Sequence, residues 1–259
     1  MTKKTYIGTY ELSVYDNEID SALQQQVYNY LLDQEYCVNF YDQPYSNWYP
    51  KHNQWHTPRN HPAAVRCPFA WDEQSLCERA PIIWNLWQEI DKCTQKRFSI
   101  SGDNPESMNY MVGISPLPGH TKSNGDPGLP NSGWRVYADG MDKEYRARTK
   151  AVHRDNPFTD DPSCFTLVYF ANLEWHPQLY GETLFHSDDS TTGDFTGKYE
   201  LDQPRNFPIG DVENVVCPRP GRFMVWDARY LHQIKPSALY AHENLMGISF
   251  RLQDRSLIR

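Results

Sequence analysis

Two segments in the first third of the chain carry the hydrophobic spacing of an amphipathic helix. The first predicted helix spans residues 16–36, and Asp16 or Asn17 can cap its start. Its apolar face consists of residues that recur every four positions, namely Ile19, Leu23, Val27 and Leu31. The second predicted helix spans 81–92, where Pro81 suits the first turn. Its apolar stripe is Ile82, Leu86 and Ile90.

The pattern changes along the chain after these helices. Residues 38–70, between the two helices, are rich in Tyr, Trp, Pro, Asn and His and predict an irregular loop region. After residue 95 the chain consists of short β-like runs separated by Gly, Pro, Asp and Asn. The candidate strands are 97–100, 107–114, 134–138, 148–153, 164–171, 182–186, 213–217, 221–226 and 245–252.

Helices followed by many short strands favour a helix-supported jelly roll over an alternating βαβ fold. We therefore expect a mainly β chain that forms a single domain over 1–259. Residues 1–94 are predicted to be a helical and loop-rich support, and residues 95–254 the jelly-roll core. The Pro- and Gly-rich stretch 115–133 is too long for an ordinary turn and is typical of a binding loop.

Charge and hydropathy limit the classes of partner. The chain has 259 residues, a formal net charge of −8 and a pI near 5.6, so it lacks the basic surface of a nucleic-acid binder. Its sequence contains no apolar run of the roughly eighteen residues that a membrane span needs. The first residues carry no apolar signal core, so the expected compartment is cytoplasmic. The six cysteines form no C-x-x-C pair and are expected to be reduced structural thiols.

The most informative motif is His153-Arg154-Asp155. Side chains alternate along a strand, so His153 and Asp155 would point to the same side and could bind one metal ion. His232, which follows the apolar run 223–226, is the best candidate for a third ligand from a distant strand. Two histidines and one carboxylate cover one face of an octahedral ion, an arrangement typical of non-haem iron(II) oxygenases.

Other histidines give weaker alternatives. His186 begins a second H-x-D with Asp188, within a polar run. The loose cluster of His52, His56 and His61 is interrupted by prolines and favours a loop over a zinc site. A kinase catalytic loop at 153–160 is excluded, because Asp160 stands where Asn is required and the sequence contains no D-F-G motif.

From about 134 to 252 the chain resembles the 2-oxoglutarate/Fe(II)-dependent dioxygenases, especially their prolyl-hydroxylase-like branch. The matching blocks, in order, are Val136–Gly140, His153–Pro157, Cys164–Asn172 with Trp175, Gly181–Phe185, Pro218–Arg222 and the strand into His232. The resemblance implies a double-stranded β-helix, a jelly roll shared with cupins, backed by N-terminal helices. It also implies Fe(II) held by His153, Asp155 and His232, with no further catalytic residue assigned.

The resemblance implies an enzyme that uses 2-oxoglutarate as a small-molecule cosubstrate. Such an enzyme hydroxylates its substrate and releases succinate and CO2. The substrate, which could be a peptide residue, an amino acid or a small metabolite, is not identified by the sequence.

The cosubstrate contacts depart from the family pattern. Leu245 stands where this branch has an arginine for the distal carboxylate of 2-oxoglutarate, and Phe170 where some relatives have a tyrosine. The resemblance leaves Tyr137, Ser249 and Arg251 as candidate cofactor-binding residues, with Arg146 and Arg148 as further possible anchors. Arg251 lies six residues past Leu245 and so on the same strand face. A cupin-like metal enzyme that does not use 2-oxoglutarate, or a non-catalytic binding domain, stays an alternative.

Overall fold

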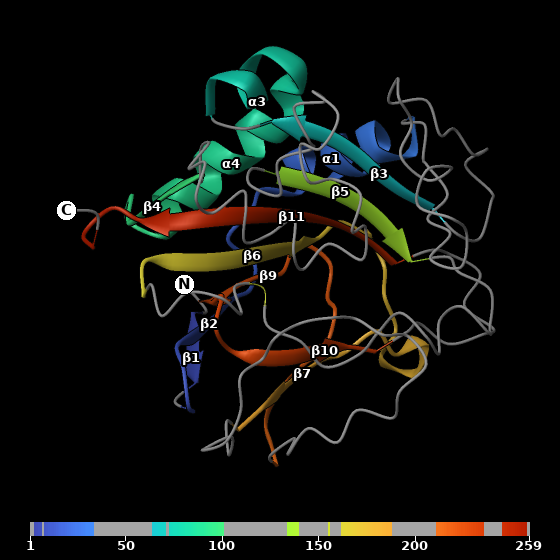
Figure 1. Ribbon diagram of the computed structural model, residues 1–259. Coiled ribbons are helices and arrows are strands. Elements are labelled where there is room, and N and C mark those ends of the chain that lie inside the picture. Colours follow the sequence, from blue (N-terminus) through green and yellow to red (C-terminus); the bar gives the residue numbers. More distant parts are fainter. Residues whose placement is uncertain are drawn as a thin grey trace, which may run out of the picture.

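The computed structural model describes residues 3–6, 8–33, 64–70, 73–100, 134–139, 155, 162–187, 211–235 and 245–257; of 64–70 and 134–139 only the backbone is described. These residues form a mainly β fold with two antiparallel sheets and a group of helices on the outside (Figure 1). The predicted fold class, a jelly-roll-like arrangement with supporting helices, is confirmed.

The larger sheet holds eight of the described strands. In spatial order these are β1 (Lys4–Tyr6), β2 (Leu12–Tyr15), β9 (Phe223–Asp227), β6 (Cys164–Phe170), β11 (Leu245–Asp254), β5 (Trp134–Asp139) and β3 (Ala64–Ala70), with β4 (Phe98–Ile100) paired to the end of β11. Each pair is antiparallel.

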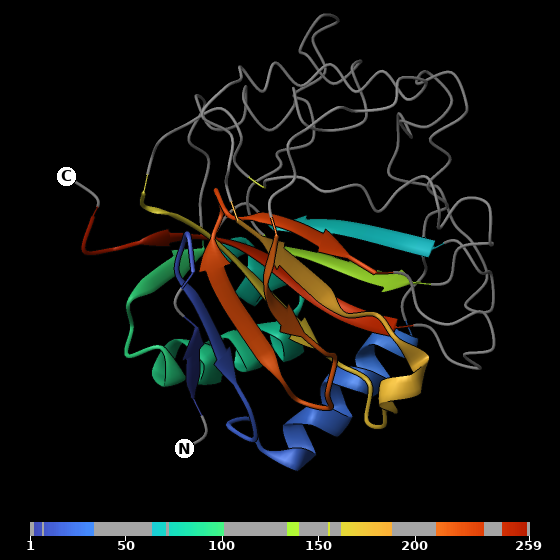
Figure 2. The same cartoon turned by 90° about the horizontal axis from the view of Figure 1, so that it is seen from below.

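The smaller sheet contains β10 (Leu231–Ile234), β7 (Thr183–His186) and β8 (Val212–Val216), in that order. The chain crosses from the larger to the smaller sheet between β6 and β7, and again between β9 and β10. Such crossings are how a jelly roll builds two facing layers. Seen from below, the smaller sheet lies in front of the larger one and the helices lie on the far side (Figure 2).

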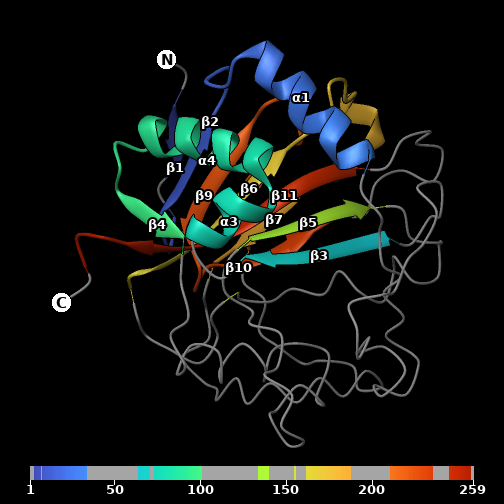
Figure 3. The ribbon, with the colours of Figure 1, turned by 90° about the horizontal axis from the view of Figure 1, so that it is seen from above.

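Three described helices cover the outer face of the larger sheet: α1 (Ser21–Leu32), α3 (Glu73–Arg79) and α4 (Pro81–Cys93) (Figure 3). Helix α4 begins at Pro81, whose fixed φ suits a first turn. Its buried side chains are Ile83, Leu86, Trp87 and Ile90. Full burial of one large apolar side chain contributes about 1.5–3 kcal/mol, so this stripe holds α4 on the sheet.

Strand alternation divides the interior into two cores. Between the larger sheet and the helices lies an outer core, to which β11 contributes Met246, Ile248, Phe250 and Leu252. Between the two sheets lies an inner core, which consists of Leu12, Val14, Val168, Phe170, Trp175, Phe185, Val216, Met224, Trp226, Tyr230 and Leu245. Because alternate residues share a face, Ser249 and Arg251 lie on the same side of β11 as Leu245, toward the smaller sheet.

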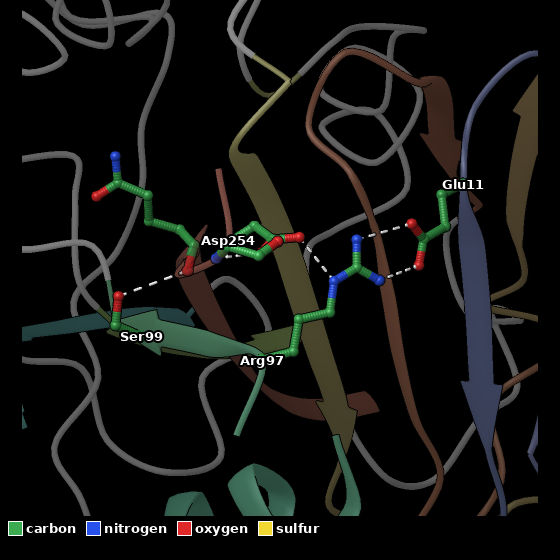
Figure 4. A network of polar contacts seen from close by, with 6 residues as sticks. Glu11, Arg97, Ser99 and Asp254 are labelled. Atoms are coloured by element: carbon green, nitrogen blue, oxygen red, sulfur yellow. Dashed lines mark hydrogen bonds and ion pairs between the residues drawn. The ribbon is translucent and has the colours of Figure 1, made fainter. Parts of the chain in front are cut away.

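An ion-pair network joins strands that are far apart in sequence. Arg97 donates to both carboxylate oxygens of Glu11, at 2.6 and 2.9 Å, and through Nε to Asp254 at 2.7 Å (Figure 4). Glu11 precedes β2, Arg97 precedes β4 and Asp254 ends β11. The guanidinium therefore ties the end of β11 to the opposite part of the sheet.

The first helix begins later than its hydrophobic pattern indicated. Asp20 caps α1, where its Oδ1 accepts a hydrogen bond from the Ala22 amide at 2.8 Å. Neither predicted cap serves, because Asp16 forms a buried ion pair with Arg222 at 2.6 Å and Asn17 has a φ of 59°. The long-range ion pair and the left-handed residue take the chain out of helical geometry before Ser21.

Several elements were not predicted. The region expected to be irregular contains β3, whose edge position and register shift between Arg66 and Ala70 accommodate Pro68. The N-terminal part also supplies β1 and β2, so the predicted core from residue 95 omits strands of the larger sheet. In the second helix the predicted stripe is partly wrong, because Ile82 is only half-buried while Ile83 and Trp87 are buried.

The predicted strands 107–114 and 148–153 and the loop 115–133 lie outside the described residues, as do Arg146 and Arg148. The cysteines whose side chains are described, Cys77, Cys93, Cys164 and Cys217, are free thiols. Within the described part of the chain, no helix is long and apolar enough to cross a membrane.

Candidate metal centre

His232 is the best-defined residue of the candidate site. It lies on β10 directly opposite Phe185 of β7, and 1% of its surface is exposed. Its Nδ1 is 2.9 Å from the backbone carbonyl oxygen of Tyr230. A carbonyl only accepts, so Nδ1 donates this hydrogen bond and Nε2 is the ring nitrogen that faces Asp155. An imidazole held in this way is ready to bind a metal ion through Nε2.

Tyr230 is itself anchored at the other end of its side chain. Its hydroxyl donates a short hydrogen bond to Glu213 and accepts one from Asn214 at 3.0 Å. Burial, together with the bond to Glu213, raises the pKa of this phenol well above its usual range. Glu213 also accepts from the backbone and side chain of Thr9, at 2.9 and 2.7 Å. The N-terminal segment thus helps to fix the carbonyl that orients His232.

Asp155 lies next to His232, although the two residues are far apart in the sequence. Its Oδ2 lies 3.6 Å from His232 Nε2, and 7% of the residue is exposed. Two cis ligands of one octahedral ion, with bonds of about 2.1 Å, lie about 3.0 Å apart, and ligands on opposite sides lie about 4.2 Å apart. The observed separation falls between these values, so both atoms can reach one ion. The donor set, one imidazole and one carboxylate, suits a divalent transition metal.

The other oxygen of Asp155 is occupied by Arg251. Arg251 Nη2 donates to Asp155 Oδ1 at 2.7 Å, and Nη1 donates to Thr166 Oγ1 at 2.5 Å. Arg251 on β11 and Thr166 on β6 are directly opposite in register. The guanidinium therefore fixes the carboxylate in one orientation and offsets its negative charge, while Oδ2 is left facing His232.

Of the other predicted site residues, Ser249 and Tyr137 lie on the neighbouring strands β11 and β5. His153 lies outside the described residues, so its place as third ligand stays a prediction. Ser249 is half-buried and directly opposite Val168. Tyr137 is opposite Gly247, and its side chain is not described. Among the described residues, which exclude His153, no group of three potential ligands gathers.

The departures from the family pattern lie within the inner core. Leu245 is 1% exposed and Phe170 is 2% exposed. Neither of these apolar side chains can pair with a carboxylate. Of the alternative histidines, His186 is 6% exposed and lies on β7 directly opposite Leu231. His176, which is exposed, caps the short 3-10 turn η1 (Pro177–Leu179). His52, His56, His61 and Asp188 lie outside the described residues.

Sequence reasoning missed two residues of the site, Thr166 and Trp226. They belong to a cross-strand row in which Leu12, Trp226, Thr166 and Arg251 are directly opposite one another on β2, β9, β6 and β11. The Trp226 ring lies edge-on to the His232 ring, with centroids 5.1 Å apart. Each residue looks like an ordinary strand position in the sequence, because only the register brings it beside Arg251.

Solved structures that are similar to this chain share little of its sequence. No family model matches the chain, and no curated protein matches it. It is similar to a prolyl hydroxylase from Trichoplax adhaerens in complex with a peptide fragment of the hypoxia inducible factor oxygen degradation domain. That likeness has 15% identity over 95% of this chain and 84% of that chain, with a TM-score of 0.46. A prolyl-4-hydroxylase from Pseudomonas putida is 10% identical over 95% of this chain and 94% of that chain, with a TM-score of 0.38.

Proposed function

We propose that this chain is an Fe(II)- and 2-oxoglutarate-dependent oxygenase that hydroxylates an unidentified substrate, with release of succinate and CO2. The observation that carries the proposal is the pairing of Asp155 Oδ2 and His232 Nε2 at 3.6 Å, both buried. The two residues come from separate parts of the chain, and each has its second polar atom held by the protein.

The iron would be held by His153, Asp155 and His232. His153 is two residues before Asp155, a spacing that lets both side chains reach one ion from the end of a strand. With iron and 2-oxoglutarate bound, the centre supplies oxidation of a substrate C–H bond by O2, coupled to decarboxylation of the 2-oxo acid.

The protein's own residues position these groups. Arg251 orients Asp155, and the carbonyl oxygen of Tyr230 orients the His232 ring. The apolar side chains of the inner core exclude water from the same region, which protects a reactive centre from side reactions. We place Tyr137, Ser249 and Arg251 at the cosubstrate, since Ser249 shares a strand face with Arg251 and Tyr137 is on the neighbouring strand β5.

Succinate formation tests the proposal directly. Purified protein with Fe(II), ascorbate and O2 is expected to convert 2-oxoglutarate to succinate, slowly without substrate and faster when a substrate from a peptide and metabolite screen is present. His153→Ala and Asp155→Ala should abolish this turnover. His176→Ala is the matched control, because this exposed histidine only caps a 3-10 turn. Equal turnover in all four proteins would refute the assignment of the ligands.

Leu245 favours one alternative function. It is buried in the inner core where the family has a cation for the distal carboxylate, so a cupin-like metal enzyme that does not use 2-oxoglutarate fits the same metal ligands. Tight Fe(II) binding by the wild-type protein, with no anaerobic binding of 2-oxoglutarate to the iron-loaded form, would select this alternative.

A further inference from the structure

Among the buried donors without a hydrogen-bond partner in the described part of the chain, two uncharged ones lie in the inner region. They are the indole Nε1 of Trp226, a residue 1% exposed, and the hydroxyl of Thr183, a residue 0% exposed. Buried polar atoms in native proteins nearly always have a partner, because an unmade hydrogen bond leaves the desolvation of the group uncompensated. An indole N–H can only donate, so the missing partner of Trp226 is an acceptor.

Trp226 lies beside the candidate metal centre. Its ring is edge-on to the ring of His232, with centroids 5.1 Å apart. It is also directly opposite Thr166, which accepts from Arg251. The orphaned indole is therefore next to one proposed metal ligand, and it shares a cross-strand row with Arg251, which donates to Asp155, with Thr166 between them.

Thr183 approaches the same region from the smaller sheet. It lies two residues before Phe185 and therefore on the same face of β7. Phe185 is directly opposite His232, and its ring is 5.6 Å from the Trp226 ring. Val216, the partner of Thr183 on β8, belongs to the inner core together with Trp226. The two orphaned donors thus face the interior from opposite sheets.

The described surroundings of these donors hold little positive charge. Both terminal nitrogens of Arg251 donate, one to Asp155 and one to Thr166, and the Asp155 carboxylate offsets the charge of the guanidinium, whose Nε has no partner among the described residues. Leu245 occupies the position where the resembled family has a cation. The far end of an organic acid bound at the metal would therefore meet neutral donors. A carboxylate oxygen accepts stronger hydrogen bonds from neutral donors than an amide oxygen does, but its desolvation also costs more, so neutral donors discriminate little between the two. A guanidinium, in contrast, strongly favours the charged group.

We propose that the Trp226 indole N–H and the Thr183 hydroxyl hold the far end of the 2-oxo acid cosubstrate, and that they select an acceptor oxygen there rather than a negative charge. This inference rests on the proposed function and assigns its cosubstrate specificity. The predicted preference is for any 2-oxo acid of this length with an oxygen acceptor at its end.

Anaerobic calorimetry of the Fe(II)-loaded protein tests the inference with three probes. These are 2-oxoglutarate, its 5-amide 2-oxoglutaramate, and 2-oxopentanoate, which ends in a methyl group. For the wild type we expect the first two to bind within about threefold of each other. The methyl-ended acid should bind at least about tenfold more weakly, the loss for two neutral hydrogen bonds.

Matched variants separate the donors from the packing. Trp226→Phe and Thr183→Val should each weaken 2-oxoglutarate binding by about threefold to tenfold and leave 2-oxopentanoate binding unchanged. Thr183→Ser should restore binding, because it keeps the hydroxyl. Trp175→Phe is the control, since this inner-core indole already donates to the Tyr180 carbonyl oxygen at 2.9 Å. Thermal midpoints confirm that each variant is folded. If Trp226→Phe does not fold, the comparison of Thr183→Val with Thr183→Ser tests the inference alone.

Unchanged 2-oxoglutarate binding in folded Thr183→Val and Trp226→Phe would overturn the inference and leave the proposed function intact. A preference of about a hundredfold for 2-oxoglutarate over its amide would also overturn it, because that ratio requires a cation at the far end. Titration with Fe(II) alone comes first. A wild-type protein that does not bind Fe(II) would remove the proposed function itself, and with it the inference.

Discussion

The contact between Arg251 and Asp155 leads to a quantitative prediction for the metal-free protein. Replacing Arg251 by Met keeps much of the side-chain volume and removes the donors to Asp155 and Thr166. Asp155 is only 7% exposed, so the change leaves a carboxylate in the interior with its cation gone. Removing one member of a buried ion pair costs about 3–5 kcal/mol. Since Arg251 retains 16% side-chain exposure, we expect the lower end, about 3 kcal/mol.

A double-mutant cycle isolates the contribution of the pair. In an Asp155→Asn background no charge is left behind, so Arg251→Met should reduce the free energy of unfolding by only about 1–1.5 kcal/mol, the value for ordinary hydrogen bonds. The coupling energy is then about 1.5–2 kcal/mol. Urea unfolding of the four proteins, in the presence of a chelator and followed by tryptophan fluorescence, measures each free energy.

Divalent metal should reduce the difference in the free energy of unfolding between wild type and Arg251→Met. An ion bound between Asp155 and His232 supplies positive charge to the same carboxylate and partly replaces the lost guanidinium. Removing the competing guanidinium should therefore lower the Kd for the metal, so the stabilisation by metal, about 2.7 kcal/mol at a hundredfold excess over the wild-type Kd, should be larger in the variant at the same metal concentration. A coupling energy within about 0.5 kcal/mol of zero, the scatter of independent sites, would refute the role of Arg251 in holding Asp155.

Three further predictions concern the rest of the molecule. The Arg222 guanidinium holds the pKa of the Asp16 carboxyl below its ordinary value of 3.8. This pair therefore stabilises the fold fully above about pH 4, and its contribution should be lost as pH falls through the lowered pKa. Urea titrations from pH 7 to 2 should show that Arg222→Met makes the free energy of unfolding fall less steeply at acid pH. Arg97→Met removes a half-exposed network and should lower the free energy of unfolding by about 1–2 kcal/mol, with no loss of Fe(II) binding in calorimetry. His232→Ala should weaken Fe(II) binding at least about tenfold, as His153→Ala should, and unchanged affinity in either variant would exclude that histidine as a ligand.

Local patterns in the sequence were sufficient to predict an element whose structure depends on residues close together in the chain. Helix α4 was predicted within one residue of its observed end, because Pro81 and an apolar repeat act within a few turns. Most strands after residue 95 that fall in the described part were also predicted, since alternation and turn residues are local signals. The same alternation correctly placed Leu245 and Arg251 on one face of β11.

Only the tertiary structure decided which groups meet. Asp16 looked like a helix cap, but a guanidinium from residue 222 offers it two charge-assisted hydrogen bonds, at 2.6 and 2.7 Å, which a capping amide cannot match. Arg251 looked like a cosubstrate contact, and in the fold it donates to Asp155 and Thr166. Trp226 and Thr183 gave no signal at all. A side chain's partners depend on strand register and on which charges are buried together, and both are set by contacts between residues far apart in the sequence.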